Sequence, residues 1–204
     1  MFQILKYENI NKNIFFNFLK EEVVLSKDPA AKNMWEEDWE KGTNYTLPYI
    51  LEKSNRFNTP NGQFHVVLFN NEIIGCAGVY KSDFNNKISL AGSRLWIKKE
   101  FRNQGINKDL TLKIHKKWSL ENNCEAVALC FNDYNKNLIE VFKRNRLGEK
   151  NNRLKYRTKE NLFYNGIIEV PFPVVIQYTK QWIIYEKLKD DFNFDWSLIE
   201  WSKK

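Results

Sequence analysis

The sequence predicts an α/β (α+β) fold, in which helices flank a mixed, mainly antiparallel sheet with a central parallel strand pair. Three apolar segments, 64–69, 72–80 and 88–97, are separated only by short turns, which is typical of an antiparallel meander. An amphipathic helix and a buried strand at 125–131 follow them. Because a helix that joins two strands of one sheet is a crossover connection, we expect 88–97 and 125–131 to run parallel.

The chain before the meander predicts one strand, at 2–7, followed by helical segments. An amphipathic helix is indicated by apolar residues at three- and four-residue spacing, namely Ile14, Phe15, Phe18, Leu19 and Val23. Residues 26–29 end this helix. A segment rich in tryptophan and acidic residues at 34–40 and a short helix at 45–53 lead to a turn at 58–62.

The meander and the helix after it have clear local signals. Asn70-Asn71 predicts a tight hairpin, because asparagine tolerates a positive φ. The helix carries apolar residues four positions apart, with lysines on its other faces, and we expect this stripe in the core: Ile106, Leu110, Ile114 and Trp118.

The chain after 125–131 predicts a turn at 132–135, a second helix, and several further elements. These are a hairpin at 165–166, a long strand at 174–188, and a short tail helix from Asp190. No internal repeat or low-complexity linker interrupts the chain. We therefore expect residues 1–204 to form a single domain, with C-terminal strands and the tail helix within 149–204.

The composition favours an anionic partner. Lysine and arginine number 32 against 25 aspartates and glutamates, which gives a net charge of +7 and suits a nucleotide-like cofactor or a nucleic acid. The three cysteines lack CxxC spacing and the two histidines stand far from them, so neither a disulfide framework nor a metal site is predicted. No window reaches the roughly 18 apolar residues of a membrane span, and a reduced, cytoplasmic protein without a membrane partner is expected.

The segment 97–107 is the most informative part of the sequence. A strand runs into a basic turn that contains Gly105 and opens the amphipathic helix. At a helix start, backbone N–H groups lack acceptors and the helix dipole is positive, so Arg102 through Lys108 would offer an anion several donors. Gly105 would let the backbone approach closely. The segment is therefore predicted to hold a phosphate.

Arg102-x-x-Gly105-x-Asn107 resembles motif A of the GNAT superfamily of acyl-CoA-dependent N-acyltransferases, which reads Arg/Gln-x-x-Gly-x-Gly/Ala. Asn135-x-x-Leu138-x-x-Val141-Phe142 resembles the later family pattern Asn-x-x-apolar-x-x-apolar-Tyr, and Leu147-Gly148 stands where relatives often have Leu-Gly-Phe. The resemblance covers about 64–148. It implies the GNAT fold and the transfer of an acetyl or other acyl group from acetyl-CoA, or another acyl-CoA, to an amine by direct attack.

The resemblance also implies roles for the cofactor-binding residues. The backbone of Leu95, Trp96 and Ile97 would pair with the pantetheine arm, and the N–H of Ile97 would polarise the thioester carbonyl. The turn and the helix start would bind the cofactor through seven residues: Arg102, Asn103, Gln104, Gly105, Ile106, Asn107 and Lys108. Of these, Asn103 to Lys108 would hold the diphosphate. Asn135 would contact the cofactor near the start of its helix.

Besides Glu149, which replaces the Phe of Leu-Gly-Phe, the sequence departs from the family pattern at three positions. Asn107 replaces the usual Gly or Ala, Cys130 lies where some relatives place a catalytic Glu, and Phe142 replaces a Tyr that protonates the leaving thiolate. Because a thiol has a pKa of about 8.5, a CoA thiolate is a tolerable leaving group near neutral pH, and its protonation is not indispensable. Tyr134 is our candidate for a substitute proton donor, with a packing or surface role as the alternative.

The acceptor site is predicted in the acidic segment before the meander. Trp35, Glu36, Trp39 and Glu40 would attract a cationic amine and contact its alkyl part. A solvated acidic face with the tryptophans packed inward is the alternative. The amine would belong to a small molecule, a peptide or a protein, and the C-terminal tryptophans would either close the acceptor cleft or form a homodimer contact.

Two other functions compete with the transferase. Asn107 and Phe142 favour a catalytically degenerate GNAT-fold protein that binds CoA or another anion without turnover. The net charge favours nucleic-acid binding, but the basic residues are dispersed and no RNP1-like run is present, so nucleic acid is the weakest partner.

Overall fold

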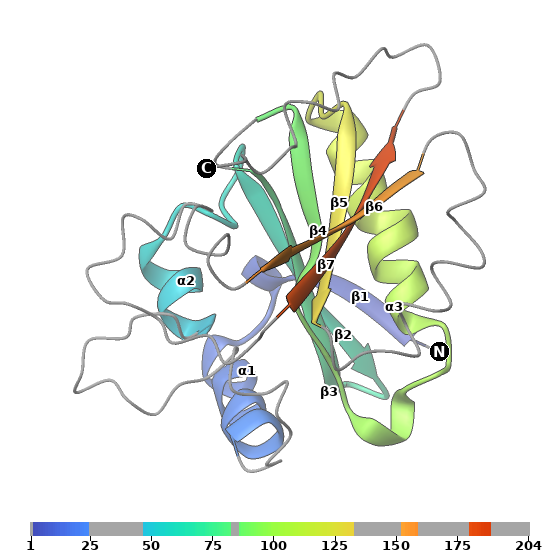
Figure 1. Cartoon of the computed structure of the whole chain (residues 1–204). Coiled ribbons are helices and arrows are strands. Elements are labelled where there is room, and N and C mark those ends of the chain that lie inside the picture. Colours follow the sequence, from blue (N-terminus) through green and yellow to red (C-terminus); the bar gives the residue numbers. More distant parts are fainter. Residues whose placement is uncertain (1, 25–46, 83–85, 133–151, 159–179, 189–204) are drawn as a thin grey trace. The chain divides into compact units, whose positions relative to one another are not determined.

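The computed structural model describes residues 2–24, 47–82, 86–132, 152–158 and 180–188 (Figure 1). The chain divides into two compact units, of which the first comprises Met1–Tyr80 and Ala91–Trp118 and the second Lys81–Leu90 and Ser119–Lys204. Strand β4 (Ile88–Ile97) contributes to both units. The single domain over the whole chain stays a prediction.

The first unit contains the meander as predicted. Its neighbouring strands are β1 (Phe2–Lys6), β2 (Gly62–Phe69), β3 (Glu72–Lys81) and β4. β1 pairs with β2, and β2 with β3, both antiparallel. Asn70 and Asn71 both have a positive φ, of 49° and 66°, as a tight hairpin of this kind requires.

One face of this sheet is covered by the N-terminal helices: α1 (Lys12–Phe18), the π-helix η2 (Leu19–Val24) and α2 (Leu47–Lys53) (Figure 1). The Asn11 side chain caps α1 by accepting from the N–H groups of Asn13 and Ile14. Four members of the predicted stripe are buried: Phe15, Phe18, Leu19 and Val23. The prediction for Ile14 is wrong, because this side chain is 59% exposed.

The other face is covered by one helix built from three consecutive segments: α3 (Ile106–Lys108), the π-helix η6 (Asp109–His115) and α4 (Lys116–Glu121). Ile106 and Leu110 pack there against Val67, Ile74 and Ile97. β3 has one extra residue opposite β2, because Val67 pairs with Gly75 but its neighbour Leu68 pairs with Ile73. This bulge places Val67 and Ile74 on the same face of the sheet. The extra residue is Ile74.

The π-helix changes which residues of this helix are buried. The expected stripe held Ile114, but Ile114 is only half-buried and His115 is fully buried. A π-helix has i→i+5 hydrogen bonds and more residues per turn than an α-helix. One turn beyond Leu110, the core position therefore falls on His115 and not on Ile114.

The second unit contains the parallel pair. Its neighbours are the start of β4, β5 (Ala126–Asn132), β7 (Lys180–Lys187) and β6 (Asn152–Thr158), and β7 is antiparallel to both β5 and β6. The N–H groups of Glu125 and Ala126 donate to the carbonyl oxygen of Lys87, at 2.6 and 3.3 Å. Because both strands start at this point, β4 and β5 run parallel, as predicted.

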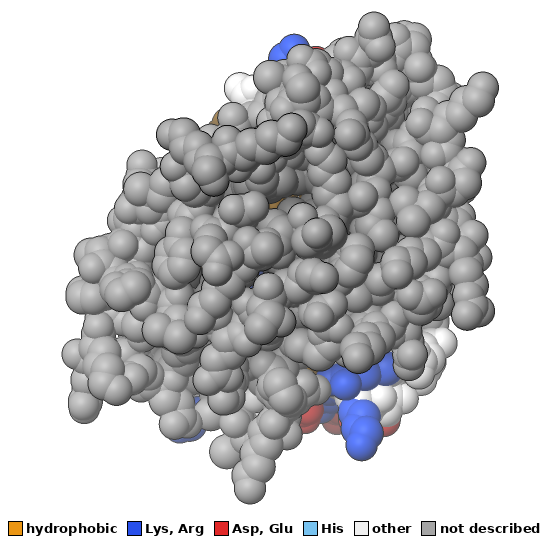
Figure 2. Space-filling view, viewed as in Figure 1, with side chains coloured by type: hydrophobic (Ala, Val, Ile, Leu, Met, Phe, Trp, Pro, Cys, Tyr) orange, Lys and Arg blue, Asp and Glu red, His pale blue; other side chains and the backbone are white. Residues whose placement is uncertain are grey.

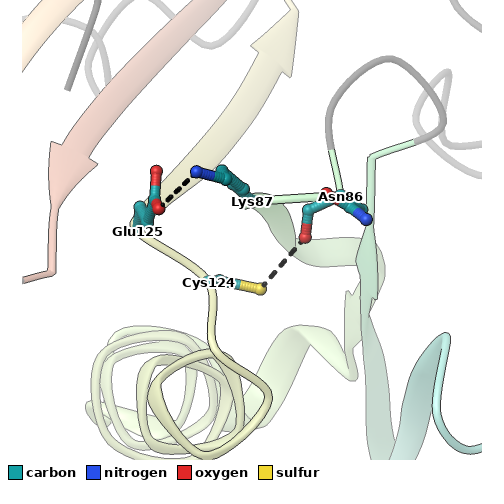
Figure 3. Close-up of polar contacts among 4 residues, drawn as sticks. All are labelled: Asn86, Lys87, Cys124 and Glu125. Carbon is teal, nitrogen blue, oxygen red and sulfur yellow. Dashed lines mark hydrogen bonds and ion pairs between the residues drawn. The ribbon is translucent and has the colours of Figure 1, made fainter.

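Two side-chain contacts reinforce this junction (Figure 3). Lys87 Nζ lies 2.9 Å from Glu125 Oε1, and the Cys124 thiol donates to the carbonyl oxygen of Asn86 at 3.9 Å. Burial raises the pKa of Cys124, so the thiol keeps the proton that it donates. The turn predicted at 132–135 starts one residue too early, because Asn132 is the last residue of β5 and pairs with Gln181. The predicted segments at 34–40, 133–135 and 165–166, and the tail from Asp190, lie outside the described residues.

Candidate cofactor site

The end of β4 leads directly into the predicted anion-binding turn. The N–H of Lys98 donates to the carbonyl oxygen of Ile74 at 2.8 Å, which fixes the last residues of the strand. One 3₁₀ turn, η5 (Lys99–Phe101), follows. Phe101 packs on the apolar cluster beneath α3, which contains Ile97, Ile106 and Leu110. Asn103 and Gly105 then adopt left-handed φ values of 64° and 81°. These two residues turn the chain into the start of α3.

Gly105 is required by its backbone conformation. A Cβ atom added there would meet no atom within 4 Å, so the glycine is not demanded by crowding within the protein. Its φ of 81° is one that glycine adopts at no steric cost. The open space at this position fits the close approach of a phosphate.

The helix start presents backbone donors to that space. Gly105 is the N-cap, and its carbonyl oxygen accepts the first helical bond from the Asp109 N–H at 3.1 Å. The N–H groups from Gly105 to Lys108 therefore have no acceptor within the helix. No side chain caps this end. The donor set matches the anion site that the sequence predicts.

The surroundings of the turn are mainly basic. Lys99, Arg102 and Lys108 are exposed. Figure 2 shows basic side chains at the lower edge of the view, where Figure 1 has the turn between β4 and α3. The acidic Asp109 in the first turns of the helix forms an ion pair with Lys113, with 2.6 Å between Nζ and Oδ1. This pairing offsets the repulsion between Asp109 and a bound anion.

Arg102 joins the turn to the end of β4. Its Nε donates to the carbonyl oxygen of Ile97 at 2.9 Å, and its guanidinium carbon lies 5.0 Å from the centroid of the Trp96 ring. Two groups of predicted cofactor-binding residues, at 95–97 and 102–108, are thus in direct contact. The sequence pattern gave no indication of this positioning contact, because it assigns the arginine to the cofactor alone.

Two amide side chains of the turn, Gln104 and Asn107, are placed differently. Gln104 Nε2 donates to the carbonyl oxygen of Glu100 at 3.0 Å, which leaves the other atoms of its amide to the exposed side of the turn. Asn107 is different, because its Oδ1 is buried and has no hydrogen-bond partner within the described residues. The side chain that departs from the family pattern is therefore partly an internal group.

Replacing Asn107 by alanine should raise the free energy of unfolding by about 1 kcal/mol, because a buried acceptor without a partner costs about 1–3 kcal/mol. Urea unfolding measures the change. Asn103→Ala is the matched control in the same turn, and it should lower stability by about 1 kcal/mol because alanine disfavours the left-handed conformation. A loss of stability in Asn107→Ala would contradict the prediction.

A bulge in β4 precedes the predicted thioester-binding backbone. Gly92 and Arg94 have φ values of 69° and 56°, which are left-handed and not strand-like. The Gly92 N–H donates to Nδ1 of His115 at 3.1 Å, and the Cys76 thiol approaches the carbonyl oxygen of Arg94 at 3.8 Å. The bulge was not predicted from the sequence, where Gly92 is its only signal.

His115 packs against the second histidine of the chain. Their ring centroids are 5.2 Å apart, and both side chains are buried. Burial, followed by the charge of Lys6, lowers the pKa of His65 to about 4. Burial, followed by interaction with His65, lowers the pKa of His115 to about 3. Both rings are therefore neutral at pH 7.

The remaining predicted site residues lie outside the described residues, and their roles stay predictions. They are Tyr134, Asn135, Trp35, Glu36, Trp39 and Glu40. The side chain of Cys130 is likewise not described. In the part of the chain that the structure describes, no three His, Cys, Asp or Glu side chains are grouped to hold a metal ion, and no helix has the length and apolar character to cross a membrane.

Solved structures with similar folds are acetyltransferases. A GNAT family acetyltransferase from Staphylococcus aureus Mu50 is 19% identical, with 93% of this chain and 100% of that chain covered and a TM-score of 0.58. A GNAT family acetyltransferase from Elizabethkingia anophelis with acetyl-CoA bound is 17% identical, with 91% of this chain and 97% of that chain covered and a TM-score of 0.51. The ribosomal-protein-S18-alanine N-acetyltransferase from Escherichia coli is 10% identical, with 95% of this chain and 100% of that chain covered and a TM-score of 0.54. At these identities the likeness shows the fold.

The sequence itself identifies the family. No curated protein matches the chain. The profile of the acetyltransferase (GNAT) family, however, matches residues 29–148, which is more than half of the chain and includes the whole turn from β4 to α3. The chain therefore belongs to the GNAT family of acetyltransferases.

Proposed function

We propose that this protein is an N-acyltransferase that moves an acetyl or other acyl group from acyl-CoA to an amine acceptor by direct attack. The observation that carries the proposal is the junction at 97–108, where Arg102 joins the basic turn to the end of β4 and the turn leads into a helix start that no side chain caps. The acetyl-CoA bound to the Elizabethkingia anophelis relative supports the same cofactor class here.

The chain's own residues suit the binding part of the reaction. The N–H groups from Gly105 to Lys108 and the basic side chains of the turn would bind the diphosphate. The backbone of Leu95, Trp96 and Ile97 would hold the pantetheine arm, and the Ile97 N–H would stabilise negative charge on the carbonyl oxygen. Acyl-CoA, when bound, supplies an activated acyl group and a thiolate leaving group.

The acceptor side of the proposal rests on residues outside the described part of the chain. Trp35, Glu36, Trp39 and Glu40 would hold a cationic amine, which must lose a proton before attack. Tyr134 would protonate the leaving thiolate, since Phe142 has no proton to give. The acceptor would be an amine of a small molecule, a peptide or a protein, and the protein would act in the cytoplasm.

Thiol release from acetyl-CoA with a panel of primary amines tests the transfer reaction. Amine-dependent release above the hydrolysis rate supports the proposal. Binding of acetyl-CoA without release by any amine would instead favour the catalytically degenerate protein. No binding at millimolar acetyl-CoA would reject every function that uses acyl-CoA and leave, of the degenerate protein, only the binding of another anion.

Replacing both Glu36 and Glu40 by glutamine should raise the KM for a cationic acceptor about tenfold, because removing charges that attract the amine costs roughly 1.4 kcal/mol of binding. The KM for acetyl-CoA should stay the same. Initial rates at varied acceptor concentration measure this, with Glu8→Gln as a control away from the acidic segment. An unchanged acceptor KM would remove these residues from the site.

A further inference from the structure

His115 makes a buried contact with the backbone of β4. Its side chain is fully buried on η6, and its Nδ1 accepts a hydrogen bond of 3.1 Å from the N–H of Gly92. The same helix begins at Gly105, in the anion-binding turn. One helix therefore contacts the β4 bulge and presents the donors of the cofactor site.

The bulge needs this acceptor. The left-handed φ of Gly92 belongs to no regular strand, and its N–H is directed to the helix that covers this face of the sheet. A buried N–H without an acceptor costs about 1–3 kcal/mol. Leu95, the first residue of the predicted thioester-binding backbone, lies only three residues beyond Gly92. A change at the bulge would therefore shift that backbone.

The hydrogen bond also fixes the chemical form of the ring. An Nδ1 atom that accepts a hydrogen bond carries no proton, so His115 is neutral with its proton on Nε2. Burial and the neighbouring ring of His65 maintain this form.

We propose that His115 is a positioning residue of the acyl transfer, which holds the β4 bulge through Gly92 and so places the backbone of Leu95 to Ile97 against the thioester. The inference rests on the proposed function. It assigns a role to a side chain that is too deeply buried to touch acyl-CoA and lies outside the motif that resembles the family.

Three variants separate positioning from general packing. His115→Leu removes the acceptor, whereas His115→Asn places an amide oxygen near the position of Nδ1. His65→Leu is the matched control, because it removes the other buried ring of the same pair and leaves the bond to Gly92. Circular dichroism and thermal unfolding establish that each variant is folded at the assay temperature.

Steady-state kinetics and calorimetric titration with CoA give the decisive comparison. In His115→Leu we expect kcat to fall about 10²-fold, the loss expected when a reacting group is displaced by about 1 Å. The Kd for CoA should rise far less, because the diphosphate-binding turn is unchanged and only the pantetheine contact with Leu95 to Ile97 shifts. His115→Asn should recover most of kcat, and His65→Leu should keep it. The inference is overturned if His115→Leu retains kcat, or if His65→Leu loses as much.

Nuclear magnetic resonance tests the bond without any assay of activity. In ¹⁵N-labelled native protein we expect a scalar coupling between the Gly92 nitrogen and Nδ1 of His115, and slow exchange of the Gly92 amide proton. Absence of the coupling overturns the inference. If the coupling is present but no amine releases thiol from acetyl-CoA, the proposed function and the positioning role of His115 both fail, and only the structural bond to the bulge remains.

Discussion

Replacing Gly105 by glutamate is expected to abolish acetyl-CoA binding. The substitution puts a carboxylate in the open space in front of the helix start, where the diphosphate would lie. Two unit charges about 4 Å apart repel by about 4 kcal/mol at an effective dielectric constant of 20. That energy corresponds to about a thousandfold loss of affinity. Calorimetric titration with acetyl-CoA measures it.

Gly105→Gln is the control that isolates the charge. Glutamine has the shape of glutamate and adopts the same unfavourable left-handed φ, at a cost of about 1–2 kcal/mol in either variant. Thermal unfolding should therefore shift equally in the two proteins. If both variants bind acetyl-CoA equally well, the diphosphate does not lie at this turn, and the assignment of the cofactor site fails.

Acid should destabilise the fold through the two buried histidines. Their pKa values in the folded protein are about 4 for His65 and about 3 for His115, below the reference value of 6.5. As the pH falls below 6.5, the unfolded chain binds protons that the folded chain does not, so the free energy of unfolding decreases. Because the unfolded ring is only half protonated at pH 6.5, the full slope of 1.36 kcal/mol per pH unit for each ring is reached below that pH, and the pair would cost about 3 kcal/mol between pH 6.5 and pH 5.

Urea unfolding at several pH values between 7.5 and 5 measures this dependence. The double variant His65→Asn/His115→Asn has no imidazole at these positions. The slope of its free energy of unfolding against pH should therefore correspond to about two fewer protons bound on unfolding. For His115→Asn alone, the slope should correspond to about one proton fewer. The same slope in all three proteins would show that the histidines do not account for the acid sensitivity.

Local signals in the sequence were sufficient to predict the meander and the turn that leads from β4 into α3. Asn70-Asn71 specified a hairpin through backbone conformation alone, and Gly105 between basic residues specified the helix start. Such features depend on a few neighbouring residues. The resemblance to the GNAT family, which rested on the same turn, was confirmed by the family profile over 29–148.

The parts that sequence analysis missed depend on contacts between distant segments. A period of 3.6 residues placed Ile114 in the core, and only the π-helix η6 brings His115 there instead. The bond between His115 and Gly92, and the contact of Arg102 with Ile97, join residues whose spacing follows no motif. The roles of Tyr134 and of the acidic segment at 34–40 stay predictions.

The π-helix η6 makes the length of this helix a structural constraint. Each residue along a helix advances the direction of the side chains by about 100°. A one-residue deletion between Leu110 and His115 would return the segment to α-helical geometry and leave the histidine four residues after Leu110, still on the face of Gly92. A one-residue insertion would instead rotate the histidine away from Gly92 relative to the donors at Gly105. The stretch from Gly105 to His115 should therefore accept changes of residue type at its exposed positions, or a deletion that restores the α-helix, far more readily than an insertion.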